Sequence, residues 1–146
     1  MLACALDLLG RTVNLPPVQL VDAPPSEVSR FSEAFTRPGS DTIYLITSTE
    51  VFRRVQRAQP RCSDYDSVRK LASILVHEAW HVHHGPDERG AYEAQLTTLA
   101  ALGAGMQTPT YDHVVRSMNR VLEAQRKATP PISLQANQAP RRTPEP

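Results

Sequence analysis

The stretch LVHEAWHVHHGPDERGAYEAQ, residues 75–95, contains four of the five histidines of this 146-residue chain. Apolar side chains recur at helical spacing on both sides of Gly85-Pro86, a pair that typically ends a helix and turns the chain. The pattern predicts one helix from Ser63 or Asp64 to His84 and a second, capped by Asp87, to about residue 102. The first helix carries a continuous apolar stripe made of Val68, Leu71, Leu75, Ala79 and Val82.

His77 and His81 lie on a different face of that helix from the stripe. Because they are four residues apart, their imidazoles project from adjacent turns and their nitrogens can bind one ion. Glu78 is next in sequence and completes the pattern H-E-x-x-H, which the metalloprotease mechanism uses for two zinc ligands and a general base. The sequence therefore predicts a zinc site with Glu78 as the catalytic residue.

A catalytic zinc ion takes three protein ligands and keeps one position open. The third ligand is expected on the helix after the turn, where Glu88 and Glu93 are the two candidates. Glu88 shares the face that packs on the domain, which includes Tyr92 and Gln95, whereas an antiparallel hairpin would bring Glu93 level with the two histidines. Position on the helix surface thus favours Glu88, and position along the helix favours Glu93.

The order HEAWH, then a glutamate on the next helix, resembles the gluzincin metallopeptidases, in particular their small single-domain forms. The stretch from Glu88 to Tyr92 is similar to the E-x-x-A-(D or N) segment that supplies the third ligand in several such families, with Tyr92 in place of the Asp or Asn. The resemblance covers residues 74–96. It implies that His77, His81 and Glu88 hold zinc, that the substrate is a peptide or protein, and that a strand before the active-site helix lines the cleft at an edge of its sheet.

The rest of the chain predicts an α+β fold, and the resemblance implies that it is a small zincin-like domain. A short β-sheet would come first, followed by the active-site helix, the glutamate helix and a C-terminal helix. Strands are expected at residues 16–22 and 42–47, and helices at 50–58 and at 26–36, where Val28, Phe31 and Phe35 would lie on one side. Thr110 would cap the last helix, which ends at about residue 128. Residues 129–146, with five prolines and few apolar side chains, predict a disordered tail after a single domain over residues 1–128.

Composition excludes several other classes. The net charge of +1 gives no basic surface for nucleic acid, and no apolar run approaches the length of a membrane span. The N-terminal stretch has Asp7 in its middle and no basic segment before it, so it is not expected to be a secretory signal. It could be the remnant of a precursor or an amphipathic turn that covers the core. The two cysteines, Cys4 and Cys62, could be bonded or reduced, so the compartment stays open with a lean to the cytoplasm.

Other residues have simpler interpretations. His83 and His84 suit the negative end of the helix dipole, and Trp80 is read as a core anchor. An oxyanion-stabilising donor could come from Tyr44, Tyr111 or His113, among which no spacing rule selects. The sequence predicts a zinc-dependent hydrolase, most simply a metallopeptidase whose substrate pairs with the strand at residues 42–47. The alternative is a zinc-stabilised interaction module without catalysis.

Overall fold

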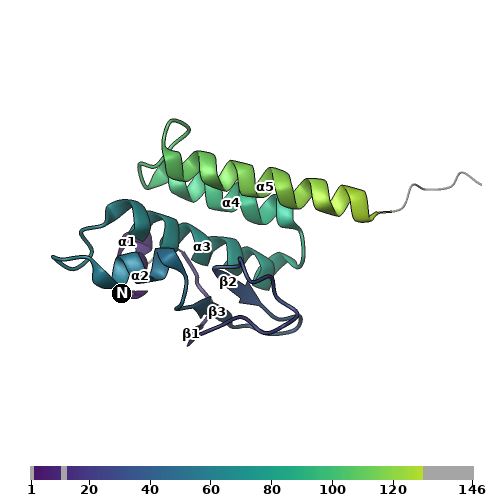
Figure 1. Ribbon diagram of the computed structural model, residues 1–146, viewed down its shortest axis with the longest axis horizontal. Coiled ribbons are helices and arrows are strands. Elements are labelled where there is room, and N and C mark those ends of the chain that lie inside the picture. Colours follow the sequence, from purple (N-terminus) through teal and green to yellow (C-terminus); the bar gives the residue numbers. More distant parts are fainter. Residues whose placement is uncertain (1, 11–12, 130–146) are drawn as a thin grey trace, which may run out of the picture.

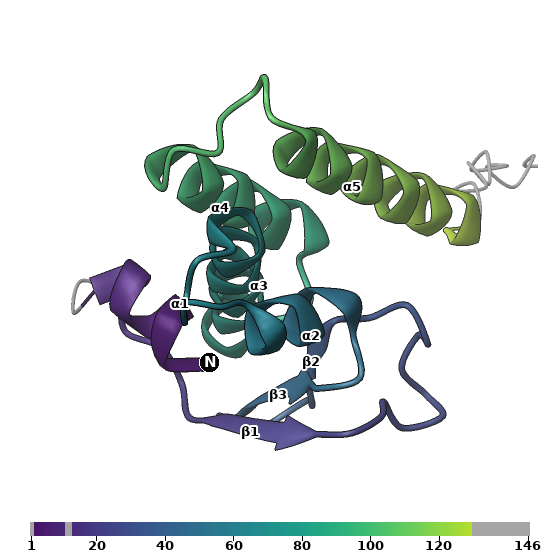
Figure 2. The same cartoon turned by 60° about the vertical axis from the view of Figure 1, so that its left-hand side comes forward.

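The long helix α3, Tyr65–His84, lies at the centre of the fold (Figure 2). In the computed structural model, which describes residues 2–10 and 13–129, α3 contacts α1 (Leu2–Leu9), α2 (Glu50–Arg57) and α4 (Glu88–Ala101). The three-stranded sheet packs against α3 as well, and α4 and α5 (Pro109–Ala128) lie on the side away from the sheet (Figure 1). The predicted α+β class is confirmed, with the helices that carry the HEAWH motif and the glutamates where the sequence placed them.

Local sequence explains why α3 starts where it does. Asp64 is its N-cap, and the side chain accepts a hydrogen bond from the backbone N–H of Ser67 at 3.1 Å. Arg54 of α2 also donates to the Asp64 carboxylate at 3.1 Å. Partial burial raises the pKa of Asp64, but the hydrogen bonds from Ser67 and Arg54 outweigh it and hold the pKa below the ordinary value. The carboxylate therefore stays charged at the positive end of the helix.

The sheet has the order β1-β3-β2, so β3 (Ile43–Ile46) is its central strand. β3 pairs in parallel with β1 (Val18–Val21) and antiparallel with β2 (Ala34–Thr36). Both strands predicted from the sequence are present. The expectation that the strand at 42–47 is an edge strand is wrong, because β3 is paired on both sides and β2 takes an outer position.

The helix predicted for residues 26–36 is also wrong. The end of this segment forms β2, and residues 26–33 form turns and bends. Phe35 stacks on Tyr44 of β3 with ring centroids 5.0 Å apart, in the register in which these two residues are direct partners. Phe31, which the helical spacing placed on the apolar side, is 79 % exposed. Pairing across the sheet thus decides the structure of a segment whose local periodicity favoured a helix.

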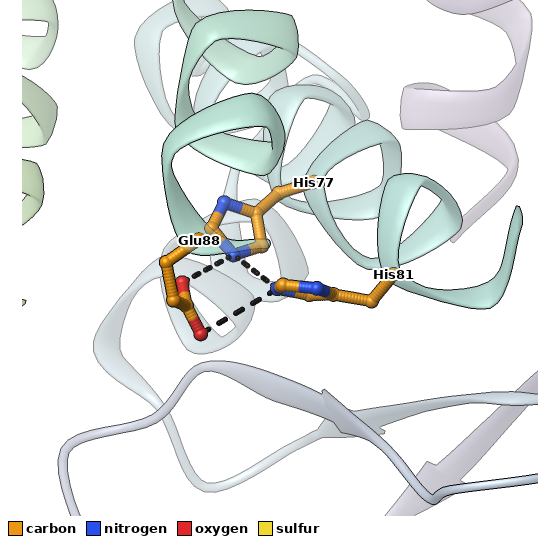
Figure 3. Close-up of side chains that lie close together, drawn as sticks. All are labelled: His77, His81 and Glu88. Carbon is orange, nitrogen blue, oxygen red and sulfur yellow. Dashed lines mark hydrogen bonds and ion pairs between the residues drawn. The ribbon is translucent and has the colours of Figure 1, made fainter. Parts of the chain in front are cut away.

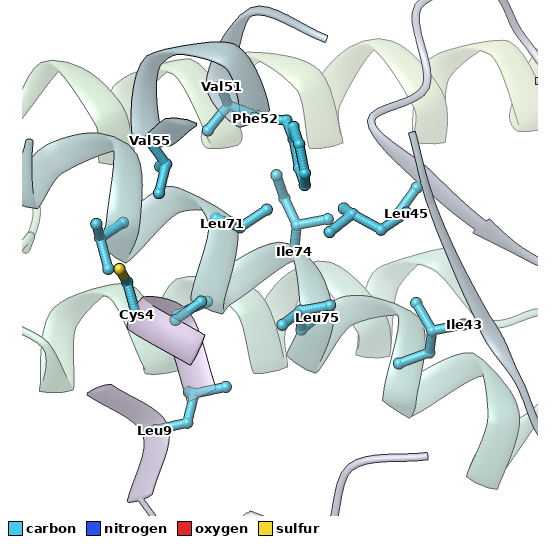
Figure 4. Packing of buried hydrophobic residues seen from close by; sticks show 14 of the residues in the cluster. Cys4, Leu9, Ile43, Leu45, Val51, Phe52, Val55, Leu71, Ile74 and Leu75 are labelled. Carbon is cyan, nitrogen blue, oxygen red and sulfur yellow. The ribbon is translucent and has the colours of Figure 1, made fainter. Parts of the chain in front are cut away.

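One apolar cluster lies between α3, the sheet and the two helices α1 and α2 (Figure 4). Its members on α3 are buried because this helix is covered by the sheet on one side and by helices on the others. A second, smaller cluster joins α4 to α5 around Leu99 and Val114. The largest side chains with almost no exposure in the first cluster are Ile43, Leu45, Leu71, Leu75 and Val55.

The N-terminal helix α1 is fixed to the body of the protein by a disulfide. Cys4 and Cys62 are bonded, with Cα atoms 5.7 Å apart and a separation of 58 positions in the sequence. Cys4, Ala5 and Leu9 are buried, so α1 covers the core, as one of the two sequence interpretations held. Disulfides are typical of oxidising compartments and rare in the cytosol, which weighs against the cytoplasmic lean of the sequence.

The C-terminal half of the chain is helical, as predicted. α5 starts two residues earlier than the sequence suggested, since Thr108 rather than Thr110 is the N-cap and accepts a hydrogen bond from the backbone N–H of Tyr111. Pro109 then occupies the first helical position, where its missing N–H costs nothing. The tail predicted at 129–146 falls, apart from Thr129, outside the described residues. Within the described part, no helix has both the length and the apolar character needed to cross a membrane.

Candidate metal site

His77, His81 and Glu88 converge at the end of α3 and the start of α4 (Figure 3). The Nε2 atoms of the two histidines are 3.2 Å apart. The two carboxylate oxygens of Glu88 lie 3.5 Å from Nε2 of His77 and 3.6 Å from Nε2 of His81. One ligand atom from each residue fits within 4.8 Å of the others, so the group could hold a metal ion.

The turn between the helices places Glu88. Gly85 has a φ of 85°, in the left-handed region that glycine adopts without strain, and it ends α3. Asp87 is the N-cap of α4, as predicted, though its side chain accepts no capping hydrogen bond. Glu88 is therefore in the first turn of α4, close to the last turns of α3. Its long side chain reaches the histidines from there, whereas Glu93 is exposed and outside the group.

Hydrogen bonds fix the tautomer of both histidine rings. The Nδ1–H of His81 donates to the backbone carbonyl of Gly85 at 2.9 Å, and that of His77 donates to Oε1 of Gln95 at 3.0 Å. The amide of Gln95 is itself oriented, because its Nε2 donates to Oγ of Ser73, which in turn donates to the carbonyl of Lys70. In neutral rings both Nε2 atoms then carry lone pairs, which is the form that binds metal.

These donors fit a zinc ion. Two nitrogens that bind one tetrahedral zinc at 2.0–2.1 Å lie about 3.3 Å apart, close to the 3.2 Å between the two Nε2 atoms. Two lone pairs and a carboxylate that face one another repel unless a proton or a cation lies between them. Two imidazoles and one carboxylate are also a donor set that favours zinc over magnesium or calcium.

The shifted pKa values of His81 and Glu88 also show that a positive charge is favoured between these side chains. The hydrogen bond to Glu88 raises the pKa of His81 to about 9, against the opposing effect of burial. The hydrogen bonds from His77 and His81 lower the pKa of Glu88 to about 2. Without a metal, a proton on His81 thus takes the place of the cation. Metal binding must displace that proton, so the affinity rises with pH.

Glu78 lies beside the group and is 8 % exposed. Burial raises the pKa of its carboxyl group, while the nearby His77 and His81 act in the opposite direction and Glu88 adds to the increase. No hydrogen bond or ion pair of Glu78 with another described residue occupies its carboxylate. A buried carboxyl group with a raised pKa next to a metal site has the properties of a proton acceptor.

The site opens into a cleft of about 1420 Å³. Residues 29 and 31–41, which include β2, form one wall, α3 forms the floor, and α4 and α5 form the other wall. Of the three proposed oxyanion donors, His113 lines the cleft, whereas Tyr44 stacks on Phe35 and Tyr111 packs in the α4–α5 cluster.

Two residues that line the cleft, Tyr92 and Gln95, were not predicted from the sequence to take part in the site. Tyr92, interpreted as packing, meets the ring of His77 edge-on with centroids 4.6 Å apart. Burial raises the pKa of Tyr92 to about 12, so its hydroxyl keeps the proton at neutral pH. Gln95 could have been noticed, because it follows Glu88 by seven residues and therefore shares its face of α4.

The remaining histidines of the motif stay outside the group, as expected. His84 stacks on the indole of Trp80 with centroids 3.9 Å apart, and Nε2 of His83 approaches the carbonyl of Asn14 at 3.5 Å. Trp80 is outside the two apolar clusters, but its Nε1 atom is buried and its indole packs between α3 and α4. It lies against Gly90 of α4.

Comparison with protein-family models, with curated proteins and with solved structures gave no significant match. The assignment of a metal-binding group to this chain therefore rests on the positions of His77, His81 and Glu88 themselves.

Proposed function

We propose that this protein is a zinc-dependent metallopeptidase in which His77, His81 and Glu88 hold the metal and Glu78 is the general base. The observation that carries the proposal is the convergence of three metal-ligand atoms within 4.8 Å, at the floor of a long cleft and beside a buried glutamate. Three protein ligands leave one position of a tetrahedral zinc for water or substrate, which is the arrangement of a catalytic rather than a structural site. The part of the chain that the structure describes offers no fourth His, Cys, Asp or Glu in this group.

Each residue has a defined task in this mechanism. A bound zinc ion would polarise the carbonyl of the scissile bond and lower the pKa of water at the site. Glu78 accepts a proton from the attacking water and transfers it to the leaving amine. Burial keeps the Glu78 carboxyl group away from bulk solvent, so the proton it accepts is retained for transfer within the site.

The substrate would be an extended peptide. β2 lines the cleft and has β3 on one side only, so its other edge can pair with a peptide backbone. This replaces the strand at residues 42–47, which the sequence suggested for the same task. Main-chain hydrogen bonds to β2 would hold the peptide above the floor of the cleft, where His77 and His81 lie.

The first experiment measures zinc per chain after dialysis, by elemental analysis. We expect one zinc in the wild type and a loss of zinc in His77→Ala and in Glu88→Gln. Glu93→Gln is the matched control, because it removes the same charge from the exposed face of the same helix and should keep the metal. No zinc in the wild type, with no uptake on titration, would refute the metal site.

The second experiment tests catalysis with Glu78→Gln. We expect this variant to bind zinc as the wild type does and to lose hydrolysis of a mixed peptide pool, with products identified by mass spectrometry. A variant that keeps its rate would show that Glu78 is not the base. Stoichiometric zinc in a wild-type protein that cleaves no peptide would favour the non-catalytic interaction module instead.

A further inference from the structure

The face of α3 that carries the metal ligands continues along the cleft toward the start of the helix. Lys70, Ile74, His77 and His81 follow one another at intervals of four, three and four residues, and all four line the cleft. Lys70 precedes His77 by seven residues, which places it about 10 Å along the helix axis. An extended peptide covers that distance in about three residues. Apolar Ile74 lies between the two positions.

Positive side chains collect at this end of the cleft. Nζ of Lys70 donates to Oε1 of Glu33 at 2.6 Å, and both side chains are largely covered. From the opposite wall, α5 contributes His113 and Arg120. Arg120 donates to the hydroxyl of Ser117 and forms no ion pair with another described residue. Glu33 therefore balances Lys70, and Arg120 leaves one positive charge in excess.

The pKa of His113 reflects the same excess of positive charge. Burial lowers its pKa, and the positive charges of Lys70, Arg116 and Arg120 lower it further, against the effect of Glu33. A group with a negative charge would be attracted to this position, and because His113 and Arg120 are exposed, dissolved salt screens that attraction.

We propose that this end of the cleft, formed by Lys70, His113 and Arg120, binds a carboxylate of the substrate about three residues from the bond that is cleaved. The inference rests on the proposed peptidase function and names the substrate class that this cleft selects. Glu33 is a competitor for Lys70 and sets how strongly the subsite attracts an acidic group. The carboxylate can come from an acidic side chain or from the C-terminus of a short peptide, because both present the same two oxygens.

The test measures peptide binding and does not depend on turnover. Zinc-loaded Glu78→Gln protein is titrated into three fluorescein-labelled heptapeptides, and fluorescence anisotropy gives each Kd. The first peptide has glutamate residues and an amidated C-terminus, the second has glutamine in their place and a free C-terminus, and the third has glutamine and an amide. We expect at least one carboxylate-bearing peptide to bind about tenfold more tightly than the neutral one, and less so as salt is raised.

Variants on the same background identify the residues responsible. Arg120→Gln and Lys70→Gln should remove most of the preference, whereas Glu33→Gln should strengthen it, because Lys70 then has no internal partner. Arg126→Gln removes a charge from an exposed position further along α5 that does not line the cleft, and should change nothing. A merely structural ion pair would give weaker binding in both Lys70→Gln and Glu33→Gln.

The outcomes separate this inference from the proposed function. Equal affinity for the three peptides, or a preference that survives Arg120→Gln, overturns the carboxylate subsite even if the wild type cleaves peptides. A preference that Arg120→Gln removes supports the subsite even if the wild type proves to have no peptidase activity. Comparison of the first two peptides shows whether the side chain or the C-terminus is the source of the carboxylate.

Discussion

The hydrogen bond between His77 and Gln95 predicts a specific loss of zinc affinity in Gln95→Leu. Oε1 of Gln95 accepts from Nδ1 of His77 at 3.0 Å, and Gln95 is only 5 % exposed, so water cannot easily replace the lost acceptor. Leucine has a similar volume without an acceptor and leaves the ring of His77 free to turn or change tautomer. Loss of such a partner typically costs about 10–100-fold in metal affinity, which corresponds to about 1.4–2.7 kcal/mol.

The affinity is measured by competition with a chromogenic zinc chelator at pH 7.5, on proteins whose folding is checked by thermal unfolding. Gln95→Glu keeps an acceptor at the same place. Provided that it folds with a buried carboxylate, this variant should bind zinc at least as tightly as the wild type. Glu93→Gln serves as the control for substitution on α4. If folded Gln95→Leu binds zinc within twofold of the wild type, then Gln95 does not position His77 and the reasoning from ring orientation is refuted.

Three further predictions concern stability, each measured by thermal or urea unfolding. Gly90→Ala should destabilise the protein, because the new Cβ would overlap the rigid indole of Trp80. Such overpacking costs about 1–3 kcal/mol, which exceeds the ~1 kcal/mol that alanine gains over glycine in a helix. An unchanged unfolding midpoint would contradict this prediction. Asp64→Ala should cost about 1 kcal/mol at pH 7 through loss of the α3 cap. Because the pKa of Asp64 is lowered by folding, its contribution is present above the ordinary value of 3.8 and is lost as the pH falls through the folded-state pKa, so wild type and variant should converge in acid. Cys4→Ser opens a loop of 58 residues and should cost about 4 kcal/mol by the chain-entropy relation, whereas equal stability of the reduced and oxidised wild type would show that the Cys4–Cys62 bond constrains little.

Part of this site is local and could be predicted. The spacing of His77 and His81 fixes their relation on any α-helix, since the geometry of the helix and not the fold sets it. Gly85-Pro86 likewise determined that a second helix follows at once, and with it that a glutamate in the next few residues lies near the histidines. The choice between Glu88 and Glu93 was not local, because it depends on how α4 leaves the turn and on how far each side chain reaches.

Other features depended on contacts between distant parts of the chain. Residues 34–36 became a strand because β3 offered a partner and Phe35 found Tyr44, although the spacing of Val28, Phe31 and Phe35 favoured a helix. The Lys70–Glu33 pair joins residues 37 positions apart, and no pattern along the sequence signals it.

The sequence by itself determined the α+β class, the positions of the long helices and the pair of histidines that could bind one ion, because helical periodicity, caps and turns act over a few residues. The tertiary structure decided which strand lines the cleft, which glutamate joins the histidines, and which charges gather around Lys70. Those outcomes depend on the packing of α3 against the sheet and α4, where burial and pairing across long sequence separations outweigh local preference.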